Sequence, residues 1–95
     1  DGRAVFQFSY PSVNNYYEID IHSTPSYGSR SSDSYVAHWL TSSRTGVSKK
    51  ICFTRGREPK TLSEAQRFST DWAELTWEYI KTGVTIDDQI RRRNN

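Results

Sequence analysis

Residues 61–83 have the pattern of one amphipathic helix, and this segment constrains the fold more than any other. Thr61 and Glu64 have the spacing of a capping box, in which the Thr61 hydroxyl accepts a backbone amide hydrogen and the Glu64 carboxylate reaches back to the Thr61 amide. Gly83 suits the left-handed residue after a helix end. At about 100° per residue, one face gathers Ala65, Phe68, Trp72, Leu75, Thr76 and Tyr79.

This apolar face predicts a helix laid across a sheet, because its arc is too wide for a coiled-coil seam. Trp77 lies at the edge of the arc. Acidic side chains gather on the opposite side of the helix, namely Asp71, Glu74 and Glu78.

Four segments before the helix predict β-strands from a period of two or from a short apolar run. They are residues 4–10, 16–22, 35–41 and 49–54. The class is therefore α+β, with the order β-β-β-β-α. Because successive strands usually neighbour one another, we expect a four-stranded antiparallel meander with the helix packed across one face.

Two of these strands carry more specific expectations. In residues 16–22, Tyr17, Ile19 and Ile21 should face the core, while the alternate side chains from Tyr16 to His22, including Glu18 and Asp20, should face solvent. Residues 35–41 are apolar on both faces, which indicates an interior strand or a covered outer face.

Length and composition favour one small domain over residues 1–83. Residues 84–95 would be a short helix that begins at Thr85, or a frayed basic tail. Because 34% of the residues are hydrophobic and 14% aromatic, the core must depend on aromatic side chains. No apolar run approaches the roughly 20 residues of a membrane span, and no leader is visible.

The chain has no methionine, which indicates a processed product, a trimmed chain or an excised domain. Its single cysteine, Cys52, permits no internal disulfide. This favours a reducing compartment and predicts a cytoplasmic location.

Residues 23–34 contain six serines, one proline and one glycine. A loop of this length is expected to be mobile or functional, with Tyr27 and Arg30 as contact residues, or else a solvated linker.

Basic residues concentrate between positions 41 and 60, a segment that contains six basic residues and one acidic residue, Glu58. They predict a binding patch made of Arg44, Lys49, Lys50, Arg55, Arg57 and Lys60. A basic hairpin over residues 44–60 could neutralise phosphates in nucleic acid. In the order of elements alone, residues 16–82 resemble the sheet-reading domains of plant ethylene-response factors and phage-type integrases.

Acidic side chains argue against nucleic acid, because the helix and the second strand would repel phosphate. The aromatic residues Tyr16, Tyr27, Trp39 and Trp77 exceed what one small core readily hides, and such residues favour protein interfaces. We therefore rank a protein-interaction or assembly module, including self-association through an edge strand, ahead of a nucleic-acid-binding domain.

Catalytic signatures are absent from the sequence. No histidine–cysteine spacing is typical of a metal site, and no cofactor or small-molecule substrate is indicated. Cys52 with His38 is the one thiol–imidazole candidate, and Asp20 with His22 the one acid–base candidate. A structural cysteine and a solvated strand face explain both, so we interpret the chain as non-enzymatic.

Overall fold

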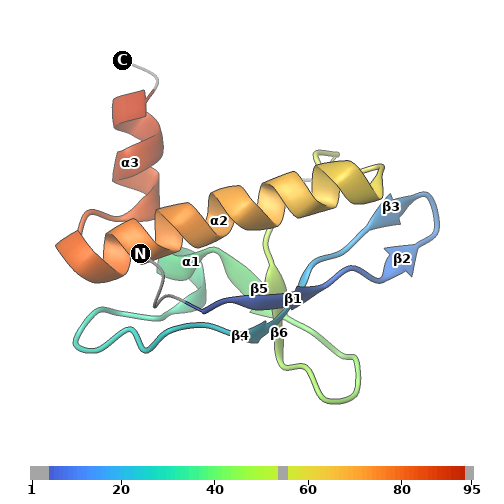
Figure 1. Ribbon diagram of the computed structural model, residues 1–95, viewed down its shortest axis with the longest axis horizontal. Helices are drawn as coiled ribbons and strands as arrows, with labels where there is room; N and C mark the ends of the chain where they lie inside the picture. Colours follow the sequence, from blue (N-terminus) through green and yellow to red (C-terminus); the bar gives the residue numbers. More distant parts are fainter. Residues whose placement is uncertain (1–4, 54–55, 94–95) are drawn as a thin grey trace.

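The computed structural model describes residues 5–53 and 56–93 (Figure 1). It contains six short strands and three helices. They are β1 (Gln7–Ser9), β2 (Ser12–Val13), β3 (Tyr16–Tyr17), β4 (Asp20–Ser23), α1 (Ser34–Ala37), β5 (Trp39–Thr41), β6 (Lys49–Ile51), α2 (Leu62–Thr82) and α3 (Ile86–Arg93). None of the helices in these ranges is long and apolar enough to cross a membrane.

Four strands form one antiparallel sheet in the order β1-β4-β6-β5, and α2 lies across one of its faces (Figure 1). The predicted α+β class, the four-stranded antiparallel sheet and the long covering helix are confirmed. The strand order corrects the expected meander, because β6 lies between β4 and β5. The amide of Ile51 in β6 donates to the Ile19 carbonyl at 2.9 Å, and Ile51 is buried, whereas β5 exposes Leu40 and Thr41. The strand with the buried side chain is thus inside, and the exposed one is at the edge.

The segment 16–22 is two strands rather than one. β3 pairs with β2 in a separate two-stranded hairpin, and β4 begins only at Asp20 in the main sheet. The break follows from hydrogen bonds outside the sheet, because the Tyr17 amide donates to the Pro59 carbonyl at 2.8 Å. Ile19 and Ile21 are buried as expected, but Asp20 is buried too, so its expected exposure to solvent was wrong.

The segment 35–41 is also not a continuous strand. It begins as the helical turn α1, in which the amide of Ala37 donates to the Asp33 carbonyl at 2.8 Å. His38 then takes the left-handed conformation (φ 59°) and the chain enters β5. The residues before the turn, Ser31 to Asp33, are poor strand formers that favour turns and caps. The likeness to sheet-reading domains required three successive strands, and the second of them contains this helical turn.

Helix α2 matches its prediction closely. The Thr61 hydroxyl accepts from the Glu64 amide at 3.1 Å, and Gly83 is left-handed (φ 82°) with its amide bound to the Tyr79 carbonyl. The Glu64 carboxylate accepts from the Lys60 amide at 2.8 Å, one residue before the expected partner. The buried face comprises Ala65, Ser69, Trp72, Leu75, Thr76 and Tyr79, with Phe68 half-buried beside it.

The serine-rich loop packs on α2 and is more than a solvated linker. The Tyr79 hydroxyl donates to the Ser31 carbonyl at 2.7 Å, and the Trp39 indole donates to the Ser32 carbonyl at 2.8 Å. The Arg30 guanidinium donates to two carbonyls at the end of α2, those of Ile80 and Lys81. The loop therefore satisfies helix-end groups that would otherwise need water.

Of the two alternatives predicted for the C-terminal segment, a short helix or a frayed tail, the structure shows the helix, α3. Thr85 accepts the Asp88 amide at 3.2 Å as an N-terminal cap, and Ile86 is buried. The Gln89 side chain donates to the Leu75 carbonyl at 3.0 Å, which attaches α3 to α2. These contacts position the apolar face of α3 beside α2.

Candidate functional site

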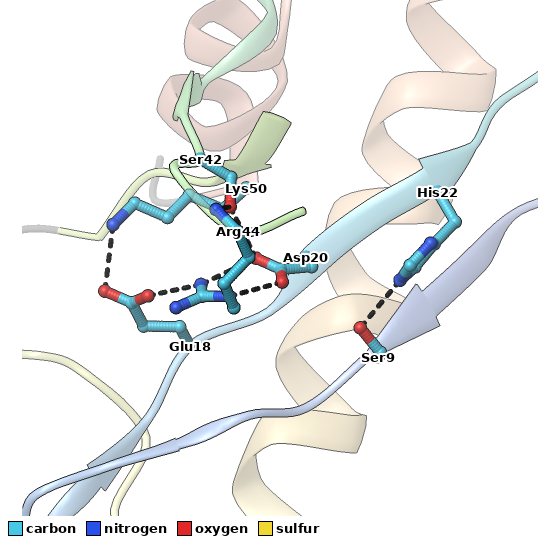
Figure 2. Close-up of polar contacts among 7 residues, drawn as sticks. All are labelled: Ser9, Glu18, Asp20, His22, Ser42, Arg44 and Lys50. Carbon is cyan, nitrogen blue, oxygen red and sulfur yellow. Dashed lines mark hydrogen bonds and ion pairs between the residues drawn. The ribbon is translucent and has the colours of Figure 1, made fainter. Parts of the chain in front are cut away.

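The sheet face opposite α2 carries a charge network, shown in Figure 2. Arg44, in the turn between β5 and β6, donates through Nε to Asp20 Oδ2 at 2.6 Å and through Nη2 to Asp20 Oδ1 at 2.7 Å. Arg44 also pairs with Glu18, and Lys50 Nζ donates to the other Glu18 oxygen at 2.9 Å. Two cations and two carboxylates therefore share one compact, charge-balanced arrangement.

Asp20 is the buried centre of this network, with 2% of its surface exposed. The hydrogen bond from Arg44 lowers the pKa of Asp20 and outweighs the opposing effect of burial. Burial by itself raises the pKa of Glu18, but the hydrogen bonds from Lys50 and Arg44 together leave it lowered. Both carboxylates are thus held in the charged form, and their structural role explains the network without a ligand.

The predicted basic patch is divided by this pairing. Arg44 and Lys50 are bound to the acids that were expected to repel phosphate, and Lys49 lies over the Trp39 ring at 4.5 Å. Arg57 and Lys60 are exposed at the approach to α2, and Arg55 lies outside the described residues. The bases that the structure describes therefore do not form one free surface.

Three of the four predicted aromatic contacts have structural partners. Tyr27 packs edge-on against Tyr79 with ring centroids 6.2 Å apart. The Lys49 ammonium lies over the Trp39 ring in a cation–π contact. Tyr16 is half-buried, and Trp77 is half-buried beneath Lys81, whose ammonium lies 5.8 Å from the ring centroid. These contacts account for part of the aromatic excess that suggested an interface.

We expect the Tyr27 phenol to ionise at a higher pH than an ordinary tyrosine. Burial, with a smaller effect of Tyr79, raises its pKa to about 12, so the folded state favours the neutral phenol. That contribution to stability is complete below the ordinary pKa of 10 and is lost as the pH rises through 12. In an ultraviolet titration of tyrosine ionisation, Tyr27→Phe should remove a transition near pH 12, and an unchanged titration curve would contradict the burial of this phenol.

The Asp20–His22 candidate is not assembled. Asp20 binds Arg44, while His22 Nε2 lies 2.7 Å from the Ser9 hydroxyl on the neighbouring strand (Figure 2). Within residues 5–53 and 56–93, no group of three or more His, Cys, Asp or Glu side chains could hold a metal ion.

An apolar groove of about 340 Å³ lies between α2, α3 and the end of β6. Trp72 and Leu75 form its buried floor. Side chains that are only partly buried, or exposed, form its walls: Phe53, Phe68 and Ile90, with Ile86 at the base of α3. Arg57 and Asp71, both exposed, complete the lining.

His38 and Cys52 also line this groove. The Cys52 amide donates to the His38 carbonyl at 3.0 Å, so the two residues are neighbours as predicted. His38 Nε2 lies 3.0 Å from Asp87 Oδ1, a contact that does not meet the geometry of a hydrogen bond. In the part of the chain that the structure describes, no hydrogen bond joins the Cys52 thiol to the His38 imidazole.

The groove draws on both predicted and unpredicted residues. Arg57 belonged to the predicted patch, and Phe68, Trp72 and Leu75 to the predicted helix face. Ile86 and Ile90 were missed, although their four-residue spacing in the C-terminal segment places them on one helix face.

Comparisons with known proteins returned no relatives. No family model matches the chain, and neither a curated protein nor a solved structure matches it.

Proposed function

We propose that this chain is a protein-interaction module that binds apolar side chains of a partner protein in the groove between α2 and α3. The observation that carries the proposal is the concave wall of Phe53, Phe68 and Ile90 over a buried floor. Its volume of about 340 Å³ is at the lower end of the roughly 300–1,000 Å³ of ligand pockets.

The distribution of polar groups supports a polypeptide as the occupant. A small-molecule site usually has a few polar groups directed at the ligand from inside the pocket. Here the His38 imidazole faces Asp87 and the Gln89 amide is bound to backbone carbonyls. The charged residues that line the groove, Arg57 and Asp71, are exposed to solvent. An apolar centre with a polar margin is the usual organisation of a protein interface.

Nucleic-acid binding by residues 44–60 stays a prediction with less support. Arg44 and Lys50 would have to leave Glu18 and Asp20 before they could neutralise phosphates, and the freed carboxylates would then repel the same ligand. A gel shift that weakens steeply with salt would favour this alternative.

Selection of phage-displayed random peptides on the whole chain tests the proposal. Enriched peptides should bind the wild type, and Ile90→Asp should weaken them at least about tenfold because it places a charge in the apolar wall. Leu62→Asp is the matched control, since Leu62 is also exposed on a helix but does not line the groove. Ile90→Ala provides a milder change if the aspartate disturbs α3.

Two results would contradict the proposal. Peptides that bind Ile90→Asp and Ile90→Ala as tightly as the wild type would place the interface elsewhere. A stable dimer in light scattering that dissociates on Ile90→Asp would assign the groove to a second copy of this chain.

A further inference from the structure

Resting on the proposed function, we infer that the groove selects a partner segment whose apolar side chains are flanked by aspartate or glutamate. The charges around the groove indicate the chemistry of its occupant. These charges come from three separate parts of the chain, namely the approach to α2, α2 itself and α3.

Three arginines lie in or next to the segments that form the apolar wall. Arg57 lines the groove directly. Arg67 lies against the ring of the groove residue Phe68, with its guanidinium carbon 5.8 Å from the ring centroid. Arg93 follows Ile90 by three residues on α3, so the helical period places it on the same face one turn further along.

Two of the acids near the groove have side-chain contacts within the fold. Asp87 contacts His38 at 3.0 Å, and Asp88 pairs with Arg91 at 2.9 Å. Asp71 is the exception, because it lines the groove and forms no ion pair with any residue that the structure describes. In the same ranges no carboxylate pairs with Arg57, Arg67 or Arg93, which leaves three cations against two anions, Asp71 and Asp87.

Charge of this kind determines which partner binds more than how tightly it binds. Exposed ion pairs contribute little individually, but complementary charge accelerates encounter and excludes partners of like charge. Lysines beside the apolar anchors of a partner segment would be repelled by the three arginines, whereas acidic residues there would be repelled by Asp71 and Asp87 alone.

Synthetic versions of the enriched peptides test the inference. Each is made in an acidic form with glutamate at its flanking positions and in a basic form with lysine there, and the apolar residues are kept. The acidic form should bind the wild type at least about fivefold tighter than the basic form. Added salt should reduce this preference while apolar binding remains.

Two substitutions at the margin should act in opposite directions. Arg57→Gln should weaken the acidic peptide by roughly two- to fivefold, and Asp71→Asn should strengthen it by a similar factor. Lys60→Gln is the matched control, because Lys60 is an exposed base nearby that does not line the groove. It should change the affinity by less than about twofold.

The outcomes separate the two proposals. If the selection enriches no peptide, or enriches only peptides that ignore Ile90→Asp, the proposed function is overturned and this inference with it. If peptides depend on Ile90 but the basic form binds as well as the acidic form, only the inference about charge is overturned. Equal effects of Arg57→Gln and Lys60→Gln would also overturn it, since net charge rather than the groove would then decide.

Discussion

Replacing Trp72 by alanine is expected to lower the free energy of unfolding by about 3–5 kcal/mol. Trp72 is 5% exposed, and both Phe6 and Phe8 meet its ring edge-on with centroids 6.0 Å away. Its indole nitrogen donates to the Ala37 carbonyl at 3.0 Å, so truncation also leaves a buried acceptor without its partner. Urea denaturation followed by far-ultraviolet circular dichroism would measure the loss without relying on the deleted fluorophore.

Trp77→Ala is the matched control for this prediction. The same side chain is removed from the same helix, but Trp77 is only half-buried and lies at the margin of the packed face. Trp77→Ala should lower the free energy of unfolding by no more than about half the loss in Trp72→Ala, because less apolar surface returns to water. Equal losses for the two variants would contradict the assignment of the Trp72 face as the one that packs on the sheet.

Arg44→Ala is expected to destabilise the fold by about 3 kcal/mol at neutral pH, at the lower end of the range for breaking a buried ion pair. The substitution removes the cation from the Asp20 carboxylate, whose side chain is 2% exposed. The Ser42 hydroxyl, at 3.3 Å, still donates a hydrogen bond to that carboxylate. The lower end applies because the Arg44 side chain is itself 34% exposed and its removal exposes the site to water. Lys60→Gln, which removes an exposed base, should change the stability by less than about 0.5 kcal/mol.

Acid should abolish the difference between Arg44→Ala and the wild type. The ordinary pKa values of Asp20 and Glu18 are 3.8 and 4.5, and the fold lowers both. Their contribution is therefore present above these values and is lost as the pH falls through the lowered pKa values of the folded state. In the variant, protonation of Asp20 should instead stabilise the fold, because it removes a buried charge that has no compensating cation. The two curves of unfolding free energy against pH should converge on acidification, and a gap that stays constant would contradict the role given to Arg44.

Neutralising both partners offers a further check on the same site. The double variant Asp20→Asn with Arg44→Met should regain part of the stability lost in Arg44→Ala, because no uncompensated charge then remains buried. Less stability than in Arg44→Ala would show that shape rather than charge dominates at this position.

The helix over residues 61–83 could be predicted because its signals are local. The Thr61 cap, the Gly83 end and the apolar period all lie within the segment, and the structure reproduces them with Leu62–Thr82 as the helix. The alternation at Ile19 and Ile21 likewise predicted burial correctly. By contrast, the α1 turn interrupts a segment with good strand composition, because tertiary contacts such as the bond from Trp72 to the Ala37 carbonyl favour a different backbone there.

The sequence by itself determined the class of the fold, the long helix and the face that this helix buries, since each depends on residues a few positions apart. Only the tertiary structure decided that Asp20 is buried, because its partner Arg44 is 24 residues away, and that β6 rather than β5 lies beside β4. The groove, too, needs the end of β6, the middle of α2 and the apolar face of α3 at one place. Helical period and capping are properties of a short segment, whereas strand order, ion pairing and concave surfaces depend on which distant segments meet.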